Sequence, residues 1–241
     1  MIYRIIISHN QSQYIHKFKE KSLFVFDAIT NNDIYECECY NQFYIKSNQI
    51  GNRSINRNTG IRYLLNNFNL LDTDIIEFYD GDRFPIKYNI EKVQELIKNN
   101  NLSVVLYICE NDSRNELYDN LQNNTLLVDT GILNNPFYSC GFAITVKAIK
   151  SIIEINSNML FNEDFTHWGV EDQYIGLLCH KLGLNVALTS EVILNGKVGG
   201  DCDNHDDYIQ SLNQYIQKIL KNNIELRLKR NNSVIISAVN T

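Results

Sequence analysis

Residues 75–82 read Ile-Ile-Glu-Phe-Tyr-Asp-Gly-Asp, an apolar run that is broken by a single glutamate and ends in two aspartates. The run predicts a buried strand over 75–79. Gly81 then allows a sharp backbone turn at the end of that strand. In such a turn the side chains of Asp80 and Asp82 need not alternate across the pleat, so both carboxylates can face one site.

Two carboxylates this close together favour a bound cation. Each negative charge raises the pKa of the other, and a cation relieves that repulsion. Oxygen ligands suit Mg²⁺ or Mn²⁺, and such an ion can bridge two phosphate oxygens. Asp-Gly-Asp is also a common surface turn, and that interpretation stays open. The apolar strand that leads directly into Asp80 favours the metal site, since a solvated turn does not need it.

Strands and helices alternate through the first half of the chain. This alternation favours an α/β fold with a mostly parallel sheet and helices on both faces. Ligands of such sheets bind outside the carboxyl ends of the strands, where Ser8, Asp27 and Asp80 fall. Beside the central run, the sequence predicts strands at 3–8, 23–27 and 103–109, a polar segment at 51–59, and helices at 60–67 and 90–98.

The second half carries another acidic segment, Trp168-Gly169-Val170-Glu171-Asp172, at the start of a helix expected over 171–182. The positive end of the helix dipole favours the ionised form of both carboxylates. A carboxylate that stays ionised can accept a proton from an attacking hydroxyl group. Acidic residues are also common in first helical turns, and Trp168 can either fill a core or stack on a sugar, so these interpretations stay open. Further helices are expected at 146–155 and 208–226.

Composition excludes some classes of protein. The chain has 241 residues, a net charge of -6 and a pI near 5.4, which argues against a nucleic-acid-binding surface. No targeting or membrane segment is visible, so a cytoplasmic protein, or a soluble domain excised from a larger one, is expected. One domain over 1–241 is expected. Scattered cysteines are expected to be reduced thiols: Cys37, Cys39, Cys109, Cys140, Cys179 and Cys202.

Three segments resemble the inverting GT-A glycosyltransferases, especially the β-1,4-galactosyltransferases and the related chondroitin-polymerase and polypeptide GalNAc-transferase branches. Residues 52–60, Asn-Arg-Ser-Ile-Asn-Arg-Asn-Thr-Gly, are similar to the family's Asn-Arg-x4-Asn-x-Gly. Residues 78–82 stand in the place of the family's Asp-x-Asp. Residues 140–144, Cys-Gly-Phe-Ala-Ile, followed by 168–172, are similar to its Gly-Gly-x-x-Ala and Trp-Gly-Gly-Glu-Asp pair. The order and approximate separations hold from about residue 50 to residue 210.

The resemblance implies a Rossmann-like GT-A fold and transfer of a sugar, with inversion, from a nucleotide-diphosphate donor to a hydroxyl of a glycan or protein. It implies a UDP-sugar as the donor and Mn²⁺ or Mg²⁺ as the cofactor. It also implies a nucleotide-binding half at 1–110 and an acceptor-binding half at 111–241. Asp82 would be the direct metal ligand, with Asp80 on the metal side and His205 as a further ligand. Asp172 would be the general base, with Glu171 beside it. The implied donor contacts are Ser8, Asp27, Arg53, Arg57, Asn58, Asp80, Gly141 and Trp168.

Two departures leave the donor sugar open. Val170 replaces the second glycine of the family's acidic segment, and Ser8-His9-Asn10 stands where the family has an arginine cluster. A sugar nucleotidyltransferase is an alternative with a similar sheet and metal site. The absence of glycine between Ser8 and Gln13 counts against it, because no glycine-rich phosphate loop follows the first strand. A non-catalytic module that binds a UDP-sugar is a further alternative.

Overall fold

The computed structural model describes residues 1–8, 12–18, 21–26, 43–46, 52–110, 121, 124–131, 137, 140–165, 170–196, 213–219 and 236–238. Three predicted site residues, Asp27, Trp168 and His205, lie outside these ranges, as does most of the helix expected over 208–226. The helices are η1 (Ser12–Lys17, a 3-10 helix), α1 (Arg53–Asn67), α2 (Ile90–Asn99), α4 (Val146–Ile155), α5 (Glu171–Lys181) and an unlabelled one at 213–219.

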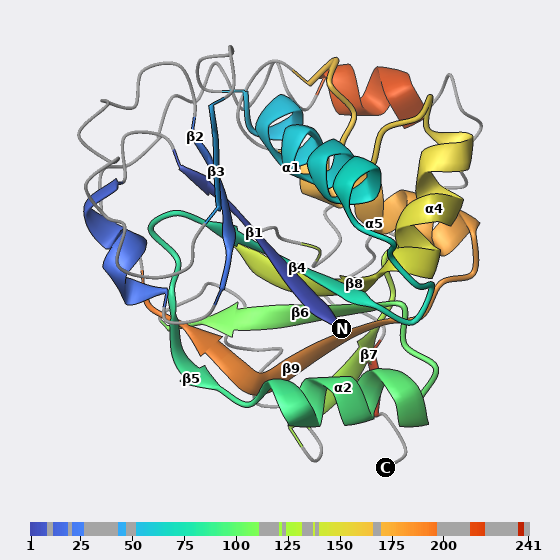
Figure 1. Cartoon of the computed structure of the whole chain (residues 1–241). Helices are drawn as coiled ribbons and strands as arrows, with labels where there is room; N and C mark the ends of the chain where they lie inside the picture. The colour runs from blue at the N-terminus through green and yellow to red at the C-terminus, as the bar shows by residue number, and fades with distance from the viewer. Residues whose placement is uncertain are drawn as a thin grey trace.

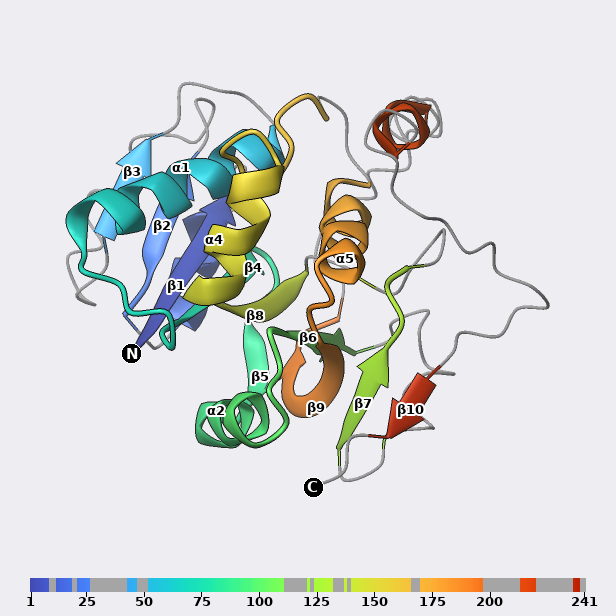
Figure 2. The same ribbon diagram turned by 90° about the vertical axis from the view of Figure 1, so that its right-hand side faces the viewer.

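The strands form a single mixed sheet in the order β10-β7-β9-β6-β8-β4-β1-β2-β3, with β5 paired to β9 (Figures 1 and 2). Strands β1, β2, β3, β4, β6, β9 and β10 run in one direction, and β5, β7 and β8 run in the other. The predicted α/β fold is therefore confirmed, with a mixed sheet in which most strands run in one direction. The bounds are β1 Ile2–Ser8, β2 Leu23–Phe26, β3 Phe43–Lys46, β4 Ile75–Asp80, β5 Pro85–Tyr88, β6 Val104–Cys109, β7 Thr125–Val128, β8 Gly141–Thr145, β9 Val186–Leu194 and β10 Ile236–Ala238.

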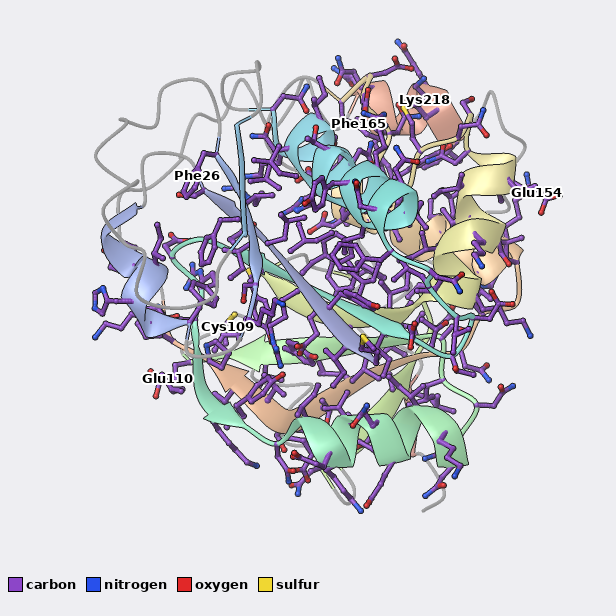
Figure 3. The ribbon with its side chains drawn as sticks, viewed as in Figure 1. Phe26, Cys109, Glu110, Glu154, Phe165 and Lys218 are labelled. Atoms are coloured by element: carbon purple, nitrogen blue, oxygen red, sulfur yellow. The ribbon has the colours of Figure 1, made fainter. Side chains whose placement is uncertain are left out.

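Two apolar cores cover the two faces of the sheet. Alternate residues of β4 point to opposite faces, so Ile76 and Phe78 join the core under α1, α4 and α5, whereas Ile75 and Tyr79 join the core that α2 covers. Figure 1 shows these helices on their two sides of the sheet. In Figure 3, Phe26 and Cys109, the last residues of β2 and β6, lie on the side of the molecule where the parallel strands end. That side is where the fold places its ligand.

Helix α1 begins at Arg53, so the helix start expected at Gly60 is wrong, and most of the polar segment at 51–59 belongs to the helix. Asn52 causes the earlier start, because its side chain accepts a hydrogen bond of 2.9 Å from the backbone N–H of Ile55. Gly60 then lies against β1 and β2. A Cβ atom at this position would lie 2.7 Å from Cγ2 of Ile5, so only glycine lets the helix approach this closely.

Glu77, the charge that interrupts the β4 run, is fully buried beneath the sheet. Its carboxylate accepts hydrogen bonds from the hydroxyls of Tyr79 and Tyr88 at 2.8 Å and from that of Tyr107 at 2.6 Å. The guanidinium of Arg4 lies 2.7 Å away. Burial raises the pKa of Glu77, and the charge of Arg4 is the main influence that opposes the rise. The cluster satisfies the charge inside the core and joins β1, β4, β5 and β6.

No helix among the described residues is long and apolar enough to cross a membrane. No disulfide joins the cysteines that the structure describes, Cys109, Cys140 and Cys179. Burial raises the pKa of Cys179 to about 12, so this thiol stays protonated and unreactive at neutral pH.

Candidate active site

The acidic turn lies at the carboxyl end of β4, as the sequence predicts. Asp80 is the last residue of the strand, and its carbonyl oxygen accepts a hydrogen bond of 2.9 Å from the backbone N–H of Arg83, which closes the turn around Gly81 and Asp82. Ser8, at the end of the neighbouring strand β1, is buried at the same edge of the sheet. The turn therefore presents two carboxylates where an α/β sheet binds its ligand.

Arg57 connects this turn to the second acidic segment. Its guanidinium donates to Asp80 at 2.7 Å and to Glu171, the first residue of α5, at 3.1 Å. Only 1% of the Arg57 side chain is exposed, and its guanidinium lies 5.0 Å from the centre of the Phe161 ring. A planar guanidinium with several fixed donors can serve two carboxylates at once. Arg57 thus holds β4 and α5 in a fixed relation.

Arg53, one helical turn before Arg57, reaches the other oxygen of Asp80 at 3.5 Å. Its side chain is 34% exposed, in contrast to that of Arg57. The two predicted donor-binding arginines therefore differ. Arg57 is enclosed between two protein carboxylates, whereas about a third of the Arg53 side chain is open to solvent.

Asp82 carries the less compensated of the two charges in the turn. Burial raises the pKa of Asp82, the negative charge of Asp80 raises it further, and Arg83 and Arg53 oppose the rise only in part. Within the described part of the chain, no other side chain donates a hydrogen bond to its carboxylate. A partly buried carboxylate of this kind fits a divalent cation, which supplies the missing positive charge.

The structure does not bring together a complete set of metal ligands from described residues. Among them, no three His, Cys, Asp or Glu side chains gather closely enough to hold an ion. His205, the predicted third ligand, lies outside the described residues. Of the predicted metal ligands, the structure therefore describes only Asp80 and Asp82.

The two acids of α5 have different surroundings. Glu171 accepts a hydrogen bond from the guanidinium of Arg57. One oxygen of Asp172 accepts a hydrogen bond of 2.8 Å from the backbone N–H of Gln173 in the first turn of the helix. This contact lies at the positive end of the helix dipole, where a carboxylate is stabilised. Of the two, Asp172 is the one that Arg57 does not bind.

Two further predicted donor contacts, Asn58 and Gly141, are packed within the protein. Asn58 is buried on α1 and exchanges hydrogen bonds with the backbone of Phe161, at 2.6 Å to its carbonyl and 3.1 Å from its N–H. It thereby holds the segment that precedes α5. Gly141 begins β8, where a Cβ atom would lie 2.6 Å from Cδ1 of Leu194, so close packing explains the glycine.

Asn195, which the sequence does not predict as a site residue, follows β9 and forms hydrogen bonds with the backbone of the acidic turn. No sequence signal identifies such a residue, because its partners are backbone groups that every residue possesses.

A pocket of about 240 Å³ lies on the opposite side of the sheet, near the buried Glu77 cluster. None of the described residues that line the pocket belongs to the predicted site. Arg4 supplies a guanidinium to the lining, but this group is already paired with Glu77. The candidate active site is therefore defined by its chemistry at the carboxyl edge of the sheet and not by this pocket.

This combination of sheet order, flanking helices and a ligand edge beside β1 and β4 is that of the GT-A fold. The chain is similar to solved structures of S. aureus TarS. With TarS 1-349 in complex with UDP-GlcNAc, the TM-score is 0.64 at 15% sequence identity, covering 91% of this chain and 67% of that one. With the same fragment in complex with UDP, the TM-score is 0.62 at 16% identity, covering 91% and 66%.

A longer TarS structure gives a TM-score of 0.62 at 15% identity, and the similarity covers 40% of its length. The chain thus spans about two thirds of the shorter TarS fragment and less than half of the longer chain. No protein family model matches the chain, and no curated protein matches it. The likeness is one of fold.

Proposed function

We propose that the protein is a metal-dependent glycosyltransferase that moves a sugar from a UDP-sugar to a hydroxyl group of a glycan or protein, with inversion at the anomeric carbon. The observation that carries the proposal is the Asp80-Gly81-Asp82 turn at the carboxyl end of β4, joined by Arg57 to the acidic start of α5. The GT-A fold supports it, since TarS has this fold and has been solved with UDP-GlcNAc and with UDP.

Asp82 and Asp80 would hold the cation, with His205 as a further ligand. A divalent ion bound there would neutralise the negative charge that develops on the leaving diphosphate. Arg53 would contact the donor phosphates, because its side chain is the exposed one of the arginine pair. Ser8, Asp27 and Trp168 would complete the donor site. Arg57 would not contact the donor but would hold Asp80 and Glu171 in position.

Asp172 would be the general base. In an inverting transfer the acceptor oxygen forms a bond to the anomeric carbon while the bond from that carbon to the diphosphate oxygen breaks. The proton of the acceptor hydroxyl passes to a carboxylate oxygen of Asp172, and the electron pair of the broken bond leaves with the diphosphate. The backbone N–H of Gln173 holds this carboxylate at the first turn of α5.

Donor hydrolysis tests this function without knowledge of the acceptor, because water can replace the acceptor hydroxyl. A panel of UDP- and GDP-sugars is incubated with the protein and Mn²⁺, and release of UDP or GDP is measured. We expect slow release from a UDP-sugar, lost when EDTA removes the metal and lost in Asp82→Asn. Asp72→Asn is the matched control, since Asp72 pairs with Lys150 on the surface. Absence of release from every donor would refute the proposal.

A further inference from the structure

Asn195 holds the acidic turn through its side-chain amide. The amide oxygen accepts a hydrogen bond of 2.6 Å from the backbone N–H of Phe84. The amide nitrogen donates to the carbonyl oxygens of Asp82 and Gly196, each at 2.9 Å. Asn195 is 5% exposed, so water does not compete for these bonds. One side chain thereby satisfies three backbone groups and connects the end of β9 to the turn.

The backbone of Asn195 reinforces the same connection. Its N–H donates to the carbonyl oxygen of Phe84 at 3.0 Å, and its carbonyl oxygen accepts from the Arg83 guanidinium at 3.3 Å. These contacts extend the pairing of β5 with β9 beyond the ends of both strands. The residues from Asp82 to Phe84 are thus each bonded to Asn195.

The carboxylate of Asp82 depends on its backbone for its position. No other described side chain donates to that carboxylate, so the backbone of the turn decides where its oxygens lie. Asn195 fixes that backbone at the carbonyl group of Asp82 itself. Groups that orient a metal ligand in this way contribute to metal affinity although they do not touch the ion.

We propose that Asn195 is the positioning residue of the metal site, which sets the affinity for the cation by fixing the backbone of Asp82. The inference rests on the proposed function, because it assumes that Asp82 binds a divalent ion. The chemistry of the site requires asparagine: one acceptor serves Phe84 and two donors serve Asp82 and Gly196. Aspartate keeps the acceptor and loses both donors, and alanine loses all three.

The test compares Mn²⁺ binding by the wild-type chain with binding by Asn195→Ala and Asn195→Asp. Free Mn²⁺ is measured by electron paramagnetic resonance during titration, with UDP present, and thermal unfolding is recorded for each protein. We expect both variants to lose about tenfold or more in Mn²⁺ affinity. The Asn195→Asp variant separates two effects on Mn²⁺ affinity, the positioning of the Asp82 backbone and the charge near the ion. An added negative charge near the ion would tighten binding, whereas loss of the two donors weakens it.

Asn156→Ala is the matched control. Asn156 is also a buried asparagine, 4% exposed, and its amide donates to the backbone carbonyl oxygens of Met159 and Leu160 at 2.9 and 3.3 Å, after α4. Its replacement should lower thermal stability in the same way and leave Mn²⁺ affinity unchanged. The control therefore removes general destabilisation as an explanation.

Unchanged Mn²⁺ affinity in Asn195→Ala, or an equal loss in Asn156→Ala, would overturn the inference and leave the proposed function intact. Tighter binding by Asn195→Asp would overturn it as well. If the wild-type chain itself binds no Mn²⁺ with UDP present, the metal role fails and the inference fails with it. That result appears in the wild type, so the two failures are distinguishable.

Discussion

Arg57 donates a hydrogen bond of 2.7 Å to Asp80 from a position where only 1% of its side chain is exposed. The same guanidinium reaches Glu171, so one buried cation serves two carboxylates from different parts of the chain. Removing it takes the closest described cationic partner from two buried carboxylates, and among the described residues only the more distant Arg53 still reaches Asp80, at 3.5 Å. Such a loss is more destabilising than the loss of a surface ion pair.

Replacement of Arg57 should therefore affect both folding and activity. We expect Arg57→Met to lower the free energy of unfolding by about 3–5 kcal/mol, as for other buried ion pairs that lose one partner. Arg57→Lys keeps the charge, but a single ammonium group cannot replace the planar fork, so donor hydrolysis should fall even where the protein folds. Chemical denaturation and UDP release measure the two effects.

The control for Arg57→Met is Arg62→Met on the same helix. Arg62 pairs with Glu163, but its side chain is 48% exposed. An exposed pair of this kind is worth about 0–1 kcal/mol. Equal destabilisation by the two substitutions would show that the buried pairs of Arg57 have no special weight.

Asp82→Asn should stabilise the metal-free protein at neutral pH. Burial and the charge of Asp80 raise the pKa of Asp82, so the folded protein holds this proton more tightly than the unfolded chain does. Above the raised pKa the ionised carboxylate therefore lowers the free energy of unfolding. The difference between wild type and variant should shrink as pH falls through that pKa, which thermal unfolding at several pH values measures.

Mn²⁺ should reverse the order of stability of these two proteins. At a concentration one hundred times its dissociation constant, a ligand of the folded state adds about 2.7 kcal/mol. Wild type should gain this stability and Asp82→Asn should not. Asp72→Asn, at an exposed surface pair, should respond to Mn²⁺ as wild type does. If Asp82→Asn is less stable than wild type when both are free of metal, there is no order of stability for Mn²⁺ to reverse, and the prediction is contradicted.

Gly60→Ala should destabilise the protein although alanine favours helices. Replacing glycine by alanine inside an unhindered helix stabilises that helix by about 0.5–1 kcal/mol. Here the added methyl would lie 2.7 Å from Cγ2 and 3.1 Å from Cδ1 of Ile5. Overpacking of a core costs about 1–3 kcal/mol, so the clash should dominate. Chemical denaturation gives the sign directly.

A double-mutant cycle with Ile5→Ala tests the cause. Ile5→Ala removes both contact atoms, so Gly60→Ala should cost less in that background than in wild type. Equal costs in the two backgrounds would mean that the close approach of α1 to β1 does not explain the glycine.

Apolar periodicity predicts some elements well and others poorly. Helices α4 and α5 begin at Val146 and Glu171, as expected from the sequence. The first two turns of α1 escape prediction because their buried residues, Asn56 and Arg57 among them, are polar, so they do not form an apolar stripe. The sequence does not predict strand β8, for a different reason. Its last residue, Thr145, is also the N-cap of α4, so no turn separates the two.

The acids of the site are predictable because each stands at the end of a strand or the start of a helix. The contacts that join these acids to one another through Arg57 cannot be predicted from the sequence. Arg57 is 23 residues from Asp80 and 114 residues from Glu171 along the chain, and only the folded sheet brings them together. The sequence therefore predicts Arg57 as a donor contact, whereas the structure encloses it between two carboxylates.

Asp172→Asn should abolish catalysis and keep donor binding. Asparagine has nearly the same shape, and its amide oxygen can still accept from the N–H of Gln173, but it cannot take up a proton at neutral pH. Loss of a general base costs about 10²–10⁴-fold in rate. We therefore expect Mn²⁺-dependent donor hydrolysis to fall by that factor while UDP affinity, measured by calorimetry, stays nearly unchanged.

Glu171→Gln provides the contrast to this variant. Glu171 binds Arg57, so its neutralisation should lower thermal stability, whereas Asp172→Asn leaves that ion pair intact. The two neighbouring acids thus have separable signatures, one in stability and one in rate. Retained turnover in Asp172→Asn, with UDP still bound, would exclude Asp172 as the base and move the search to residues outside α5.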